Sequence, residues 1–270
     1  MTAPVFLFTP ETIEPADAVA SAAFGTVLML TGPEARHAVT VKRLRAQERV
    51  DLVDGAGLRL VCEVTGAGVG GAKDRLAVRV LERVEEPEPS LRLTLVQALA
   101  KGGRDEQAVE TATEVGVGLV LPWQSERCVS VWQGAKQAKG RQRWQATALQ
   151  AAKQARRARV PEIGEARDTR RLADWVGRTV RGGGVVLVLH EEAGTAISTA
   201  VESLGLPAPE EVPPVLAVVV GPEGGISPEE TAVLEAAGAM TVRLGPHVMR
   251  TASAGPVALA VLAHASGLWE

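Results

Sequence analysis

The sequence predicts an α/β protein in two parts, a small β-barrel followed by a parallel sheet with helices on both faces. Three observations support this prediction. Residues 25–84 form short apolar runs punctuated by glycine. From Leu91 onward, runs that are apolar throughout alternate with helical stretches, which is typical of a parallel sheet buried on both faces. Between them, the segment EEPEPS at 85–90 has the proline-rich, charged composition of a linker.

In the first part, three apolar stretches are expected to be strands: 26–30, 49–64 and 75–84. The second stretch is interrupted by Asp54-Gly55 and Gly57, which favour a hairpin turn between two alternating apolar runs. A short helix is expected around 34–44.

In the second part, strands and helices are expected to alternate. The predicted strands are 91–99, 117–123, 185–190, 215–220 and 240–245. The predicted helices are 104–115, 134–158, 169–180, 196–204, 228–237 and a last one from about 255. A proline-rich surface loop is expected at 206–214.

Composition limits the classes of function. The chain is 46% hydrophobic and 23% charged, and no apolar run approaches the roughly 20 residues of a membrane span. The opening residues have no basic segment and no long apolar segment, so no signal peptide is expected and the protein is expected to be cytoplasmic. The two cysteines and four histidines form no metal-binding pattern, and no metal is expected.

Basic residues are concentrated in one block. Between Arg127 and Pro161 the chain has no Asp or Glu, although the net charge of the whole chain is −3. The basic residues of this block are Lys136, Lys139, Arg141, Arg143, Lys153, Arg156, Arg157 and Arg159. Such a one-sided block indicates a contact for a polyanion, and a solvated helix face is the alternative.

The stretch VVVGPEGGISPEE at 218–230 predicts a strand, a glycine turn and a helix. Ser227 suits the helix N-cap, Pro228 the first turn, and Glu230 completes a capping box. Backbone N–H groups at such a turn can face a ligand. The stretch matches neither common phosphate-binding pattern, and Glu223 would repel a phosphate, so a neutral or cationic ligand fits better. A plain tight turn is the alternative.

Two further strand ends carry Gly, Pro or polar residues. The strand at 185–189 ends in Leu189-His190-Glu191, and the strand at 240–244 is followed by GPHVMRTASA. Parallel strands end at the same edge of a sheet, so the three loops are expected to share one pocket.

These motifs resemble those of the SPOUT methyltransferases and, more narrowly, the RsmE family of bacterial 16S ribosomal RNA uridine-N3 methyltransferases. The matching residues are LHE, then GPEGG followed by S-x-E, then LG-x-x-x-x-R-T, in this order near the C-terminus. The resemblance extends upstream, to stretches around His37, Gln97, Ala112, Ser125 and Arg143.

The resemblance implies a PUA-like β-barrel at 1–86 that helps to bind RNA, and a SPOUT methyltransferase domain at 87–270 with a C-terminal trefoil knot. It implies S-adenosyl-L-methionine as cofactor, 16S rRNA or the 30S subunit as substrate, a role in rRNA processing and ribosome biogenesis, and a homodimer. The implied cofactor-binding residues are Leu189, His190, Gly221, Glu223, Gly224, Gly225, Ile226, Leu244, Gly245, Val248 and Met249. The predicted RNA-binding residues are Arg43, Lys101, Arg104, Arg127, Arg143, Gln154, Arg157 and Arg159.

Methylation of uridine N3 requires loss of a weakly acidic proton, so negative charge that develops on the ring must be stabilised. We assign this catalytic role to Arg250 as a hypothesis. A purely structural ion pair of Arg250 with a carboxylate is the alternative.

The sequence departs from the family pattern at position 252, where Ala replaces the usual Glu. Thr111 likewise stands where Lys is common, and Pro4-Val5-Phe6-Leu7-Phe8 replaces an Arg-Phe element. An RNA-binding or ribosome-assembly protein that has lost catalysis is therefore one alternative function. A ribose 2′-O-methyltransferase is another, but its motifs rely on Asn and the chain contains none.

Overall fold

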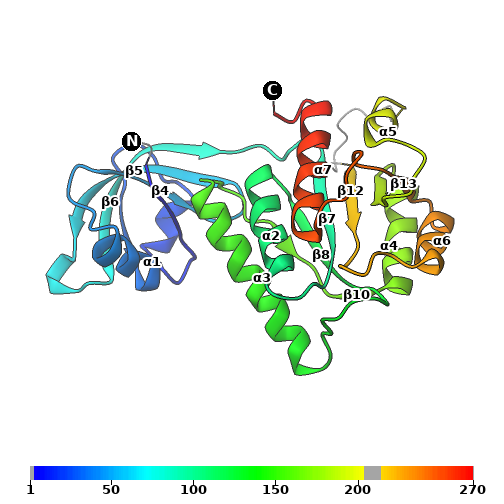
Figure 1. Cartoon of the computed structure of the whole chain (residues 1–270). Helices are drawn as coiled ribbons and strands as arrows, with labels where there is room; N and C mark the ends of the chain where they lie inside the picture. The colour runs from blue at the N-terminus through cyan, green and yellow to red at the C-terminus, as the bar shows by residue number, and fades with distance from the viewer. Residues whose placement is uncertain (1–2, 204–213, 270) are drawn as a thin grey trace. The chain divides into compact units, whose positions relative to one another are not determined.

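The computed structural model describes residues 3–203 and 214–269, which divide into two compact units (Figure 1). The N-terminal unit comprises Met1–Glu88 together with Ala152–Val160, and the C-terminal unit comprises Pro89–Ala151 and Pro161–Glu270. The boundary predicted at 86/87 assigns 152–160 to the second part, whereas the contacts of this segment are with the first. Of the surface loop expected at 206–214, residues 206–213 lie outside the described residues.

The N-terminal unit is built on a mixed sheet of six strands. Its strands are β1 (Val5–Leu7), β2 (Ile13–Glu14), β3 (Val27–Thr31), β4 (Arg49–Val53), β5 (Leu58–Ala67) and β6 (Arg75–Glu85). They lie in the order β1-β4-β5-β6-β3-β2, in which β1 pairs with β4 in parallel and all other pairs are antiparallel. Alternate residues of β4, β5 and β6 are buried in one apolar core, as expected for a sheet with one solvated face.

Short helical segments complete this unit. They are η1 (Ala16–Val19), α1 (Gly32–Arg36), η2 (His37–Val41) and η3 (Val69–Gly71). The single helix predicted at 34–44 is thus two consecutive helical segments that begin slightly earlier. The predicted hairpin joins β4 to β5, and the carboxylate of Asp54 closes its turn by accepting from the N–H groups of Ala56 and Leu58.

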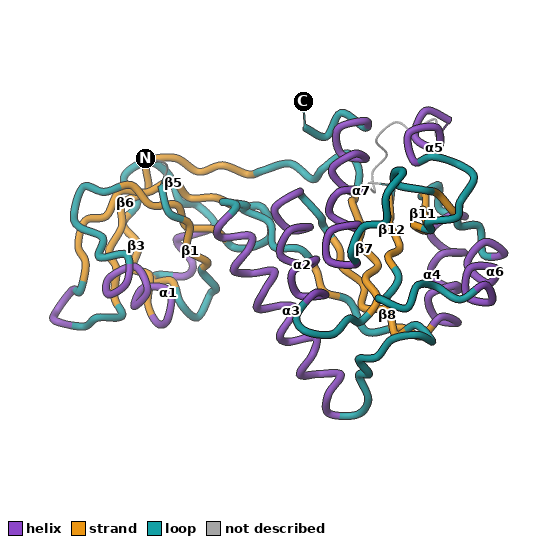
Figure 2. Tube along the Cα trace, viewed as in Figure 1, coloured by secondary structure: helices purple, strands orange, loops and turns teal. Residues whose placement is uncertain are grey.

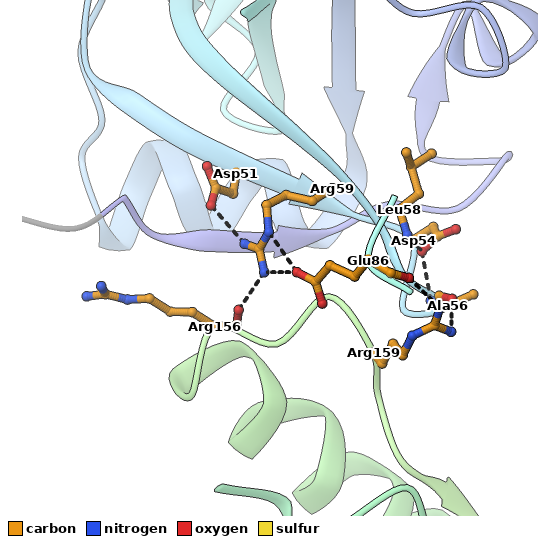
Figure 3. Close-up of polar contacts among 8 residues, drawn as sticks. All are labelled: Asp51, Asp54, Ala56, Leu58, Arg59, Glu86, Arg156 and Arg159. Atoms are coloured by element: carbon orange, nitrogen blue, oxygen red, sulfur yellow. Dashed lines mark hydrogen bonds and ion pairs between the residues drawn. The ribbon is translucent and has the colours of Figure 1, made fainter. Parts of the chain in front are cut away.

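The segment 152–160 contributes to the core and edge of the N-terminal unit. Ala158 is buried against Val5 and Val53. The N–H of Val160 donates to the carbonyl of Gly55 at 2.9 Å. The guanidinium of Arg159 donates to the backbone carbonyls of Ala56 and Glu86 and pairs with the carboxylate of Glu88, as Figure 3 shows in part.

Arg59 on β5 is the centre of the polar contacts at this edge (Figure 3). Its guanidinium pairs with Asp51 at 2.9 Å and with Glu86 at 2.7 Å, and donates to the carbonyl of Arg156 at 2.8 Å. Burial works to lower the pKa of Arg59, but the hydrogen bonds and charges of the two carboxylates outweigh it and the pKa is raised. Arg59 therefore joins β4, the end of β6 and the segment 152–160.

The C-terminal unit is built on a parallel sheet, of which strands β7, β8, β11 and β12 are labelled in Figure 2. Its strands are β7 (Arg92–Ala98), β8 (Leu119–Gln124), β9 (Glu162–Ile163), β10 (Arg167–Asp168), β11 (Val185–Leu189), β12 (Val215–Val220) and β13 (Met240–Val242). The order is β10-β8-β7-β12-β11-β13, with β9 also paired to β8.

Helices cover both faces of this sheet, as predicted. They are α2 (Arg104–Val115), α3 (Ala135–Gln154), α4 (Thr169–Arg181), α5 (Ile197–Ser203), α6 (Pro228–Ala236) and α7 (Thr251–Ala265). One apolar core lies between the sheet and α2, α3, α5 and α7, and a second lies between the sheet and α4 and α6 (Figure 1).

Two helix ends differ from the prediction for local reasons. α3 ends at Gln154 rather than 158, because Arg156 has the left-handed φ of 59° that terminates a helix. α7 begins at Thr251, four residues before the predicted start, because the N–H groups of Ser253 and Ala254 donate to the carbonyl of Arg250.

We expect Arg59→Met to destabilise the N-terminal unit by about 2 kcal/mol, because two carboxylates lose a charged hydrogen-bond donor in a partly buried setting. The free energy of opening of β4 and β5 amides, measured by native-state hydrogen exchange, reports this loss. Arg75→Met is the matched control, because its pair with Glu14 has side chains 43% and 56% exposed. It should cost less than about 1 kcal/mol. Equal losses in the two variants would contradict the role of Arg59.

Candidate functional site

The carboxyl ends of β13, β11 and β12 meet at one edge of the sheet, because the three parallel strands are neighbours. The loops that follow them line a single cavity of about 820 Å³. All residues predicted to bind the cofactor lie on its wall, and so does Arg250. The tertiary structure thus brings together three motifs that are up to 60 residues apart in the chain.

The glycine turn after β12 has the predicted local structure. Ser227 caps α6, its hydroxyl accepts from the N–H of Glu230, and the carboxylate of Glu230 accepts in return from the N–H of Ser227. Gly221 has no room for a side chain, because a Cβ there would lie 2.6 Å from Ile226. Gly225 has a left-handed φ of 74°, which favours glycine.

The carboxylate of Glu230 does more than cap a helix. Glu230 is only 5% exposed, and its Oε1 also accepts from the N–H of Glu126 at 2.9 Å and from the hydroxyl of Thr169 at 2.6 Å. It therefore joins the glycine turn to the loop after β8 and to the start of α4. The sequence signals Glu230 as a capping residue, but it gives no sign of the contacts with Glu126 and Thr169, which are far away in the chain.

Thr251 connects the third loop to the sheet. Its hydroxyl donates to the carbonyl of Gly221 at 2.8 Å and accepts from the side-chain amide of Gln97 at 2.8 Å. Gln97 on β7 is fully buried. This chain of hydrogen bonds fixes the first residue of α7 against the end of β12.

Glu223 faces the start of α2. Its carboxylate accepts from the backbone N–H of Lys101 at 3.3 Å and from the guanidinium of Arg104 at 3.1 Å. Burial works to raise the pKa of Glu223, but hydrogen bonds from the backbone and from Arg104 outweigh it and the pKa is lowered. The carboxylate of Glu223, whose charge was expected to repel a phosphate, is thus already paired with the guanidinium of Arg104.

Two predicted RNA-binding residues, Arg104 and Arg127, line the cavity. Arg127 donates to the carbonyl of Gly224 at 3.2 Å, so the loop after β8 packs on the glycine turn. Arg243 on the cavity wall was not singled out by the sequence, because it lies among ordinary strand residues.

The other predicted RNA-binding residues are not on the cavity wall. Arg143 on α3 forms an ion pair with Glu106. Burial lowers the pKa of Arg157 to about 10, against the opposing effect of Glu86. The residues that belong to the N-terminal unit are Arg43, Gln154, Arg157 and Arg159. Their contact with RNA stays a prediction.

Arg250 is exposed at the cavity, immediately before α7. Within residues 3–203 and 214–269, no carboxylate lies within ion-pair distance of its guanidinium. Ala252, at the position of the usual family Glu, is 5% exposed and is not part of the cavity wall. The cavity therefore presents a cation that is not neutralised by the described part of the chain.

The described residues contain no group of three or more His, Cys, Asp or Glu side chains arranged to hold a metal ion. Among the same residues, no helix is both long and apolar enough to cross a membrane.

Comparisons with known proteins agree on one family. Residues 86–263 match the sequence model of an RNA methyltransferase domain, and residues 30–72 match that of an RNA methyltransferase PUA domain. The ribosomal RNA small subunit methyltransferase E of Mycobacterium tuberculosis is 44% identical over 91% of this chain and 89% of its own. The Bacillus subtilis protein of the same name is 27% identical over 88% and 90%.

Solved structures are similar over almost the whole chain. The ribosomal RNA small subunit methyltransferase E from Neisseria gonorrhoeae, bound to S-adenosyl methionine, is 25% identical with a TM-score of 0.77 and covers 97% of this chain and 98% of its own. A putative methyltransferase from Legionella pneumophila, also with bound SAM, is 25% identical with a TM-score of 0.76 and covers 98% of each chain.

We expect Thr251→Val to lower the free energy of unfolding of the C-terminal unit by about 2 kcal/mol, because it removes the hydroxyl that accepts from the buried amide of Gln97 and donates to the carbonyl of Gly221. Urea unfolding followed by tryptophan fluorescence measures this unit, since all five tryptophans belong to it.

Thr231→Val is the matched control for this variant. The hydroxyl of Thr231 donates to the carbonyl of Ser227, which also accepts from the N–H of Thr231. Its loss should cost less than about 0.5 kcal/mol. Equal stability of both variants would contradict the proposed role of Thr251.

Proposed function

This chain belongs to the family of the ribosomal RNA small subunit methyltransferase E proteins, and we propose that it methylates N3 of a uridine in 16S ribosomal RNA. As a member of this family it is a methyltransferase of ribosomal RNA that uses S-adenosyl-L-methionine, and its N-terminal unit is PUA-like. The observation that carries the proposal is the single cavity formed by the three loops that bear the family motifs.

The cavity fits the cofactor in size and chemistry. A volume of about 820 Å³ lies within the range of roughly 300–1,000 Å³ typical of small-molecule pockets. Val248 and Met249 are 75% and 45% exposed, so the wall carries apolar side chains that a nucleoside would cover. A Cβ at Gly245 would meet no atom within 4 Å, so this backbone is open to a ligand.

We propose that the loops hold the cofactor largely through backbone groups, beside the side chains of Leu189, Ile226 and Met249. When bound, S-adenosyl-L-methionine supplies an electrophilic methyl group on a positively charged sulfur. The task of the chain is then to align donor and acceptor, and a cavity whose loops are fixed by Glu230 and Thr251 suits that task.

Arg250 is proposed to stabilise the negative charge that develops on the uracil ring as its N3 proton leaves. A guanidinium can donate to a carbonyl oxygen of the ring and keeps its charge at every physiological pH. The absence of a carboxylate partner for Arg250 in the described chain supports this role over a structural ion pair.

The alanine at position 252 is no argument that catalysis has been lost, because Ala252 is buried and is not part of the cavity wall. The alternative of an RNA-binding or assembly protein without activity therefore has no support from the lining of the site. A ribose 2′-O-methyltransferase remains the second alternative, and identification of the methylated nucleoside separates it from our proposal.

Further parts of the proposal concern partners. We propose that RNA is contacted by the eight predicted residues Arg43, Lys101, Arg104, Arg127, Arg143, Gln154, Arg157 and Arg159, with the 30S subunit as the assembled form of the substrate. We also propose a homodimer, a cytoplasmic location and the trefoil knot implied by the SPOUT resemblance.

The test of the function is transfer of a labelled methyl group from S-adenosyl-L-methionine to 16S rRNA, both free and within 30S particles, followed by nucleoside analysis. The expected product is 3-methyluridine at one position. A 2′-O-methylated nucleoside, or cofactor binding without any transfer to either substrate, would refute the proposal.

We expect Arg250→Ala to lower the rate of methyl transfer at least about 100-fold, with cofactor affinity changed little, because it removes stabilisation of developing charge. Single-turnover transfer and calorimetric cofactor titration measure the two quantities. Arg250→Lys keeps the charge but not the planar fork and should be intermediate. Full activity of a folded Arg250→Ala protein would exclude the catalytic role.

We expect Ala252→Glu, which restores the usual family residue, to destabilise the protein by about 3 kcal/mol and not to increase the rate of methyl transfer. The reason is that Ala252 is only 5% exposed, so the variant would place a carboxylate in a buried position. Thermal unfolding and single-turnover transfer measure the two effects. A stable variant with a strongly increased rate would show that the chain lacks a catalytic carboxylate.

A further inference from the structure

Five further arginines lie on α4 and the strand before it. They are Arg167, Arg170, Arg171, Arg178 and Arg181. In the described part of the chain, none of the five side chains forms an ion pair. In contrast, Arg143, Lys153 and Arg159 of the basic block predicted to contact a polyanion are paired with carboxylates.

The five arginines form two stripes. Arg171 and Arg178 are seven residues apart, which places them two turns apart on one face of α4, and Arg167 directly precedes this face. We call Arg167, Arg171 and Arg178 the α4 arginine stripe. Arg170 and Arg181 lie on an adjacent face, and Asp174 lies between the two faces, because it is four residues after Arg170, three after Arg171 and four before Arg178.

Arg167 is the least solvated member of the stripe. Its Nε is buried and has no hydrogen-bond partner in the described chain. Burial first, and then the charges of Arg178 and Arg171, lower the pKa of Arg167, while Glu165 acts in the opposite direction. A buried donor without a partner and three neighbouring like charges both cost free energy in the protein alone. An anion bound at the stripe would offset both costs.

The nearby acids do not neutralise the stripe. Asp168 is committed to helix capping, since its Oδ1 accepts from the backbone N–H of Arg171 at 2.8 Å. Glu165 and Asp174 are both exposed, and among the described residues neither forms an ion pair with the stripe. The N-terminus of α4 adds the positive end of its helix dipole on the same side.

The stripe is rigidly connected to the cavity within the C-terminal unit. Thr169 lies between Arg167 and Arg171, and its hydroxyl shares the carboxylate of Glu230 with the N–H of Glu126. Arg127, which follows Glu126 in the chain, is on the cavity wall. A long ligand held at the stripe would therefore be positioned relative to the cavity through fixed contacts.

We propose that Arg167, Arg171 and Arg178 bind the phosphate backbone of the RNA substrate, as a contact outside the methyl-transfer cavity. This inference rests on the proposed function, because the ligand it assigns is the RNA acceptor. Arginine suits this ligand, since its planar fork matches two phosphate oxygens. Trp175, partly buried, lies between Arg171 and Arg178 on the same face and offers an aromatic edge to a sugar or base.

The test compares Arg171→Gln/Arg178→Gln with Arg170→Gln/Arg181→Gln, which removes two exposed arginines from the adjacent face of the same helix. The probe is 16S rRNA transcribed in vitro, and its affinity is measured across a range of salt concentrations. Loss of two phosphate contacts should reduce the slope of log K against log salt by about 1.4–1.8. Between about 50 and 200 mM salt, the affinity ratio of parent to variant should then shrink about tenfold. The control should keep the parental slope.

Cofactor titration and methyl transfer at saturating RNA accompany the binding measurement. Unchanged cofactor affinity shows that the stripe variant is folded, and its methyl transfer should recover at saturating RNA. A slope equal to that of the parent, or an equal loss in both double variants, would overturn the inference.

If the parent transfers no methyl group but the stripe variant still loses salt-dependent RNA binding, the proposed function fails and the phosphate contact stands. Tight binding of an acidic protein at the stripe without any effect on RNA binding would assign it to a protein partner instead.

Discussion

The geometry of the site depends on one buried carboxylate, that of Glu230. It accepts hydrogen bonds from Ser227, Glu126 and Thr169, which belong to the glycine turn, the loop after β8 and the start of α4. A carboxylate in such a position is costly unless its oxygens are satisfied, and here three neutral donors satisfy it. The backbone of the glycine turn can therefore stay open toward the cavity, while Glu230 holds the turn in place on the side away from the cavity.

The hydrogen bonds of Thr251 complete this arrangement from the other side. Gln97 on β7, the hydroxyl of Thr251 and the carbonyl of Gly221 form a chain of hydrogen bonds that fixes the start of α7 beside the end of β12. Arg250, the residue immediately before, is left exposed at the cavity. Polar groups that shape the site thus lie behind the cavity, whereas Arg250 on its wall forms no ion pair with the described residues.

The basic residues of this protein likewise divide into those in ion pairs and those that form none with the described residues. Part of the positive charge in the acid-free block between Arg127 and Pro161 is used in internal ion pairs, such as those of Lys153 with Glu34 and Arg159 with Glu88 within the N-terminal unit. In the described part of the chain, Arg250 and the arginines of α4 form no ion pair. Net charge along the sequence therefore does not identify the surface that is available to RNA, because ion pairs between distant residues consume part of it.

The sequence by itself determined the local structure and the family. Alternating apolar periods predicted most strands and helices, and Ser227, Pro228 and Glu230 specified the turn after β12, because these signals act between residues close in the chain. The motif residues also predicted that three loops share a pocket, since parallel strands end at one edge. Only the tertiary structure decided the partners of Glu230, Thr251 and Arg59, the assignment of 152–160 to the N-terminal unit, and the separation of paired from unpaired arginines. These contacts join residues up to 154 positions apart, as Gln97 and Thr251 are, and no local pattern encodes which distant group will meet them.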